Sequence, residues 1–185
     1  MKILKIFFLI ILGISILGAI YFLSKWNKIN IDKNIGKSIN IKNLDKKVFD
    51  QTYLIFDSTK VTTDFELFKN QNDTVTFSFS ASKSPKSRNI TLLNFNHSNG
   101  FTGVNINVTK FENHFFTSTE SYTDNIGIFD FLKPEELVVK NQKLTLNKSE
   151  YKKGDSIFGK IELEIKSTPN NEMLNSKGYF RGVVK

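Results

Sequence analysis

The sequence predicts an all-β protein, an antiparallel β-sandwich with Greek-key connections, preceded by a single N-terminal transmembrane helix. Three observations lead to this prediction: an uncharged apolar run near the N-terminus, segments in which apolar and polar residues alternate, and short turn-forming segments between them. The length of 185 residues fits one domain and an anchor. We predict an anchor at residues 1–26, a polar tether at 27–47 and the sandwich at 48–185.

The predicted anchor contains a run of 18 uncharged and mainly apolar residues, 6–23. A helix needs about 20 such residues to cross a bilayer, whereas the apolar region of a cleaved signal peptide has about 7 to 15. No small-residue cleavage site follows the run. Tyr21 and Trp26 lie where aromatic side chains mark the membrane interface. We therefore predict an uncleaved signal anchor.

The orientation of the anchor does not follow from charge, because lysines flank both ends of the run. The segment before the run is very short and an all-β domain follows it. This arrangement favours an extracytoplasmic domain at the cytoplasmic membrane, with a cytoplasmic domain as the alternative. The lysine-rich segment 27–47 is typical of an extended tether, which we expect to enter the sheet near Ile39.

Period-two alternation marks the clearest strands. In residues 74–81, one face carries Val75, Phe77, Phe79 and Ala81, and the other carries threonine and serine. Residues 104–108 and 161–165 repeat the pattern. Weaker strand predictions are 52–57, 64–69, 89–95, 113–120, 126–131, 136–140, 142–147 and 177–184. Many short strands separated by turn signals predict a sandwich or barrel.

The composition excludes several kinds of function. The chain has no cysteine, which excludes disulfides, thiolate metal sites and a cysteine nucleophile. The net charge is +8, but the lysines are scattered and the only arginines are Arg88 and Arg181, which argues against nucleic-acid binding. This charge fits attraction to anionic lipid headgroups or acidic envelope polymers, and solubility alone also explains it.

One segment carries a resemblance to a known class of domain. Residues 144–165 contain the pattern Tyr-x-x-Gly-Asp-x-Ile-x-Gly, formed by Tyr151, Gly154, Asp155, Ile157 and Gly159. The pattern resembles the opening of immunoglobulin-like and macroglobulin-like β-sandwich modules of bacterial envelope proteins. The resemblance implies a fold but no active site, since those modules share no single activity. We expect Gly154 and Asp155 to form a tight turn under Tyr151, and Gly159 to permit a close backbone approach.

We predict no catalytic residue, no metal site and no cofactor. His97 and His114 lack the His-x-His or His-x-x-x-His spacing of metal ligands. Residues 124–127 lack the alternating oxygen ligands of a calcium loop, and no serine stands in a nucleophile motif. A hydrolase would need polar residues from separate loops, such as His97, Asp124 and Asp130, to meet in one pocket.

Aromatic residues are concentrated between residues 111 and 131. If their rings are exposed, we predict an interaction surface formed by Phe111, Phe115, Phe116 and Tyr122, because a large exposed apolar patch usually marks a partner or a ligand groove. The alternative is that these rings fill the core of the sandwich.

These observations together predict a membrane-anchored, extracytoplasmic binding or structural module that is not an enzyme. The lipid bilayer is the expected partner of residues 6–23, and an envelope protein or an anionic polymer is the expected partner of the domain. Two alternatives stay open. One is an accessory subunit of a membrane complex, with its contacts on the anchor and tether, and the other is an envelope hydrolase.

Overall fold

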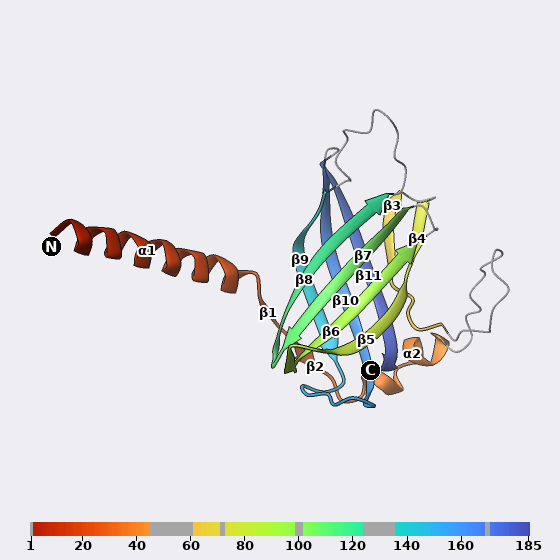
Figure 1. Cartoon of the computed structure of the whole chain (residues 1–185). Helices are drawn as coiled ribbons and strands as arrows, with labels where there is room; N and C mark the ends of the chain where they lie inside the picture. The colour runs from red at the N-terminus through yellow and green to blue at the C-terminus, as the bar shows by residue number, and fades with distance from the viewer. Residues whose placement is uncertain (1, 45–60, 71–72, 99–101, 124–135, 169–170) are drawn as a thin grey trace.

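The computed structural model describes residues 2–44, 61–70, 73–98, 102–123, 136–168 and 171–185. A long N-terminal helix projects from a domain that is mostly β-strand (Figure 1). The helical segments are α1 (Lys2–Ser24), the short 3-10 helix η1 (Ile35–Lys37) and α2 (Ile39–Asn43). The strands are β1 (Asn27–Lys28), β2 (Asn30–Ile31), β3 (Glu66–Asn70), β4 (Asp73–Thr76), β5 (Ser78–Ser84), β6 (Ser87–Ser98), β7 (Thr102–Phe111), β8 (His114–Thr123), β9 (Glu136–Leu146), β10 (Ser156–Thr168) and β11 (Glu172–Val183).

The strands form two sheets, ordered β1-β8-β7-β6-β5 and β2-β9-β10-β11-β3-β4. Within each sheet, the described neighbouring strands pair antiparallel, except that β2 pairs parallel with β9. Strands that follow one another in the chain are neighbours from β5 to β8 and from β9 to β11, which is a meander. In the second sheet β11 also pairs with β3, which is far from it in the chain. The prediction of an all-β domain is confirmed at the level of two mainly antiparallel sheets.

Two of the three clearest strand predictions are confirmed. Residues 104–108 lie in β7 and residues 161–165 in β10, with their apolar side chains turned inward. Residues 74–81 are divided between β4 and β5, and the buried Phe77 lies where the chain passes from the second sheet to the first.

The weaker predictions fall into three groups. Segments 64–69, 89–95, 113–120 and 177–184 coincide largely with β3, β6, β8 and β11. Segments 136–140 and 142–147 belong to one strand, β9. Segments 52–57 and 126–131 lie outside the described residues.

Aromatic rings from both sheets share one hydrophobic core. The ring of Phe180 in the second sheet lies 4.5 Å from that of Phe79 and 5.3 Å from that of Phe95, both in the first sheet. The surrounding core side chains are also almost wholly buried. Burial of this apolar area, at about 25 cal/mol per Å², is the main source of stability for the fold.

The segment after α1 is built into the domain. β1 pairs with the edge strand β8, β2 pairs with β9, and the side chain of Ile29 between them is buried. These short strands satisfy backbone groups at two sheet edges. The chain therefore meets the sheets earlier than expected. Ile39, the expected point of entry, begins α2 and is 71% exposed.

Candidate functional site

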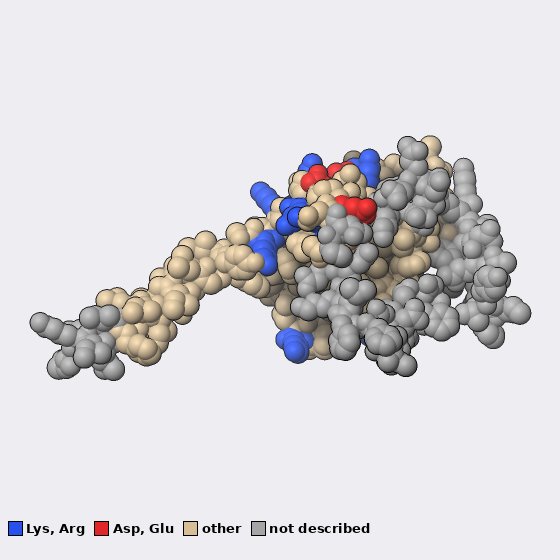
Figure 2. Space-filling model, turned by 90° about the horizontal axis from the view of Figure 1, so that it is seen from above, with Lys and Arg blue, Asp and Glu red and all other residues tan. Residues whose placement is uncertain are grey.

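The helix α1 presents an unusual surface. Residues Phe7–Ser24 have a mean hydropathy of 2.5, and none of them is buried against the domain. On the face seen in Figure 2, residues 7–24 of the helix show no charged side chain. An exposed apolar surface of this size marks an interaction site, and 18 residues are long enough to cross most of a bilayer.

The helix ends in an aromatic contact with the domain. The ring of Trp26 lies 6.0 Å from that of Phe22 on the helix and 6.2 Å from that of Phe116 on β8. Lys25 Nζ lies 4.5 Å from the centre of the Tyr21 ring. We call Phe22, Trp26 and Phe116 the aromatic junction. Such aromatic side chains, with lysine beside them, are typical of the membrane–water interface.

A hollow of mainly apolar character opens beside this junction. It is lined by Phe22, Leu23, Trp26, Phe111, Glu112 and His114. Phe111, Glu112 and His114 belong to the β7–β8 hairpin, and strand β8 of this hairpin pairs with β1. The hollow therefore lies where the helix, the first sheet and the hairpin meet.

Gln142 fixes the junction to both sheets. Its side chain on β9 is 92% buried, since 8% of it is exposed. Gln142 Oε1 accepts a hydrogen bond from the backbone N–H of Thr117, at 2.9 Å. Gln142 Nε2 donates to the backbone oxygen of Lys25 and to Asn27 Oδ1, both at 2.8 Å. Both donors and the acceptor of the amide are thus used, and the amide connects β8, β9 and the end of α1.

The four aromatic residues expected to form a surface lie in different places. Phe115 is completely buried in the core, and Phe116 is partly buried against Trp26. Phe111 and Tyr122 are 39% and 38% exposed, but they lie at opposite ends of the β7–β8 hairpin. The structure thus brings Phe111 and Phe116 to the helix end and separates Tyr122 from them.

Of the polar residues weighed as a hydrolase site, only His97 lies in the part of the chain that the structure describes. His97 Nδ1 lies 2.8 Å from the backbone oxygen of Thr76, near the end of β6, whereas His114 begins β8 at the other end of the sheet. Asp124 and Asp130 lie outside the described residues. Within the described ranges, no group of three or more histidine, aspartate or glutamate side chains is arranged to hold a metal ion.

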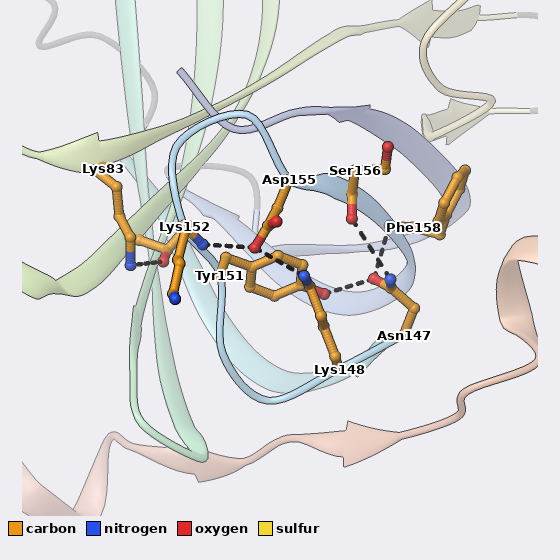
Figure 3. Close-up of polar contacts among 9 residues, drawn as sticks. Lys83, Asn147, Lys148, Tyr151, Lys152, Asp155, Ser156 and Phe158 are labelled. Atoms are coloured by element: carbon orange, nitrogen blue, oxygen red, sulfur yellow. Dashed lines mark hydrogen bonds and ion pairs between the residues drawn. The ribbon is translucent and has the colours of Figure 1, made fainter.

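The loop between β9 and β10 closes one end of the domain (Figure 3). Asn147 Oδ1 accepts hydrogen bonds from Tyr151 Oη at 2.6 Å and from the backbone N–H of Phe158 at 3.0 Å. Asp155 Oδ2 lies 2.7 Å from both Lys148 Nζ and the backbone nitrogen of Lys152. The Lys148 ammonium is the main cause of a lowered pKa for the Asp155 carboxyl.

The turn expected in this loop is confirmed. Gly154 has a φ of +90°, a conformation that suits glycine, and the side chain of Tyr151 in the same loop is buried. Burial raises the pKa of the Tyr151 hydroxyl. At Gly159, a Cβ atom would lie 2.7 Å from the backbone oxygen of Thr145, so the close approach predicted for this glycine is also confirmed.

A polar row lies next to this loop on the inner face of the first sheet. Lys83, Thr91 and Lys110 occupy directly opposed positions on β5, β6 and β7. Lys83 Nζ donates to Thr91 Oγ1 at 3.2 Å, and Lys110 Nζ donates to the backbone oxygen of Glu112. Burial, followed by the nearby charge of Lys83, lowers the pKa of the Lys110 ammonium.

Sequence reasoning did not single out this row or Gln142, although a signal exists for each. The alternation of Ile106 and Val108 continues inward to Lys110, and that of Phe79 and Ala81 continues to Lys83. Gln142 stands two residues before the buried Leu144, so the alternation of β9 places it on the same inward face.

A comparison of the chain with known protein families, with curated proteins and with solved structures finds no match. The geometry of the chain is therefore the basis for assigning a function.

Proposed function

We propose that this chain is a single-pass membrane protein whose helix α1 spans the cytoplasmic membrane and holds a β-sandwich on the outer side as a binding or structural module. One observation carries the proposal. An apolar helix with no buried residue is joined, through the aromatic junction and Gln142, to a domain that starts at Asn27.

The aromatic junction supports a position at the headgroup level. Trp26 follows the apolar run directly, and Lys25 and Lys28 stand beside it. Tryptophan rings are enriched at the interface, and lysine favours it because it combines an apolar stem with a charged end. The domain would therefore stand directly on the bilayer, since only two residues separate α1 from β1.

The shared core supports the sandwich. Rings of both sheets are in contact, and β1 and β2 cover the edges of β8 and β9. A domain closed in this way exposes polar outer faces and the ends of its strands. A binding module would bind an envelope protein or an anionic polymer on these surfaces.

The absence of cysteine from the chain makes a direct test of topology simple. Single-cysteine variants Asn141→Cys, at an exposed position of β9, and Lys2→Cys, at the start of α1, are labelled in intact cells with a membrane-impermeant maleimide. We expect labelling of Asn141→Cys in intact cells, and of Lys2→Cys only after permeabilisation. The cysteine-free parent measures the background.

The reverse labelling pattern would place the domain in the cytoplasm and contradict the orientation. Alkaline carbonate extraction of the same membranes tests the anchor separately. The full chain should remain in the membrane pellet, and its release into the supernatant would contradict the proposal.

A further inference from the structure

We propose that the domain binds a phosphate group in a pocket at the end that adjoins the aromatic junction. The pocket is lined by Lys83, Arg88, Asn89, Lys110, Glu112, Glu150 and Tyr151. We call it the basic pocket. This inference adds a ligand to the module proposed above, and it rests on that proposal only for the source of the phosphate.

Lys110 is the strongest reason to expect an anion. Its side chain is 98% buried, since only 2% is exposed, and it continues the inward-facing row of Ile106 and Val108. Lysine is almost never buried to this extent without a partner of opposite charge. Among the described residues, however, no carboxylate lies within ion-pair distance of Lys110, and its one hydrogen bond goes to a backbone oxygen.

A second lysine stands close to the first. Lys83 and Lys110 lie on either side of Thr91, on β5 and β7, so their backbones are about 10 Å apart, or two strand spacings. Each ammonium group has three N–H donors, and each uses one of them in the protein. Two flexible side chains at this separation can bring their remaining donors to one tetrahedral oxyanion.

Arg88 completes the recognition surface, and Tyr151 forms part of the pocket wall. Arg88 is exposed at the start of β6, where its guanidinium can form paired hydrogen bonds to phosphate oxygens. Tyr151 comes from the β9–β10 loop, which closes this end of the domain beside Lys83 (Figure 3). The pocket thus combines a buried positive charge with an accessible one.

Two carboxylates on the pocket lining set a limit on this attraction. Glu112 and Glu150 are both exposed, and both favour the charged form of Lys110 from a distance. Burial and Lys83 outweigh them, because the pKa of Lys110 is lowered overall. The compensation within the protein is therefore incomplete, and an oxyanion would supply the missing negative charge.

The position of the pocket suggests where the phosphate comes from. Glu112 lines both the basic pocket and the hollow at the helix end. If α1 spans the membrane as proposed, this hairpin faces the lipid headgroups. A lipid phosphate and free inorganic phosphate offer the same chemistry to the three basic side chains, and the experiment separates the two sources.

The test uses the full chain in maltoside micelles, which carry no phosphate. The melting temperature is measured while inorganic phosphate replaces chloride at constant ionic strength. We expect stabilisation that saturates with phosphate and gives a dissociation constant. Lys110→Met and Arg88→Gln should each weaken that constant about tenfold, the typical effect of losing a charge-assisted hydrogen bond. Lys177→Met, on the exposed outer face of β11, should not change it.

Two further readouts distinguish a binding role from a structural one. Without phosphate, Lys110→Met should melt at the same temperature as the parent or higher, because it removes a buried charge without an ionic partner. Glu150→Gln should bind phosphate several-fold more tightly, because it removes a competing negative charge. Arg88→Gln is at an exposed position and keeps the test valid if Lys110→Met fails to fold.

The source is identified in a second titration, in which an anionic phospholipid is added to the same micelles. If the lipid stabilises the protein at a lower concentration than phosphate does, the pocket binds a lipid headgroup. If only phosphate stabilises the protein, the pocket binds the free ion. A parent protein that responds to neither, or a response that is equal in Arg88→Gln and the parent, would overturn the inference. Neither result depends on the topology experiment, so the two proposals can fail separately.

Discussion

Asp155 is the residue whose charge does most to hold the β9–β10 loop. Its carboxylate accepts hydrogen bonds from the Lys148 ammonium and from the backbone of Lys152, just before the positive φ of Gly154. Both contacts favour the ionised form, which is why the pKa of Asp155 lies below its ordinary value of 3.8. The carboxylate and the glycine together set the turn that brings Tyr151 over the end of the core.

The lowered pKa of Asp155 predicts how stability depends on pH. A carboxyl whose pKa is lowered by folding stabilises the fold above its unfolded value and loses that contribution as the pH falls through its folded value. We expect Asp155→Asn to melt at a lower temperature than the parent at neutral pH, and the difference to shrink as the pH falls below 3.8. Thermal melts monitored by circular dichroism at a series of pH values measure this difference.

The control for that experiment is Asp32→Asn, which removes a carboxylate from the exposed segment after β2. A difference between Asp155→Asn and the parent that stays constant down to strongly acid pH would contradict the assigned role of the charge.

Among the structural elements, β1 and β2 determine how the anchor and the domain are joined. Each consists of two residues, yet one pairs with the first sheet and the other with the second. Gln142 provides the side-chain contacts between these edges. The segment after α1 is thus held by both sheets, and its position does not depend on the short strands alone.

Gln142→Leu tests this connection. Leucine keeps the volume of the side chain but leaves the buried N–H of Thr117 without its acceptor, which costs about 1 to 3 kcal/mol. Urea unfolding of the full chain in micelles should show a loss of this size, and Asn141→Leu, at the exposed neighbouring position, should show little change. Equal effects of the two substitutions would contradict the role given to Gln142.

The elements differ in how well the sequence predicts them. Strands β5, β7 and β10 could be found because one face of each is buried, and burial of one face requires period-two alternation. The pairing order could not be found, since it depends on contacts between distant strands. The polar composition of residues 27–47 predicts a tether, but in the described part of that segment four side chains are buried, Ile29, Ile35, Ile41 and Leu44.

The candidate site shows the same division. The apolar length of α1 and the interfacial position of Trp26 are properties of adjacent residues, and they could be predicted. The contact of Trp26 with Phe116, and the burial of Lys110 beside Lys83, depend on register between strands. Aromatic content alone could not distinguish the buried Phe115 from the partly exposed Phe111.

At the largest scale, we propose that the aromatic junction lies at the headgroup boundary and that the domain rests directly on the bilayer. The apolar helix, the immediate start of β1 and the basic pocket beside the same hairpin all agree with this position. If a long tether joined the helix to the domain, Trp26 would lie at the membrane interface and the hairpin would lie in water.

Trp26 is the only tryptophan of the chain, so its fluorescence reports on the junction alone. The full chain is reconstituted in vesicles whose lipids carry a spin-label quencher either near the headgroup or near the end of the acyl chain. We expect stronger quenching of Trp26 by the shallow label than by the deep one. Stronger quenching by the deep label, or no quenching by either, would contradict the proposed seat of the domain on the membrane.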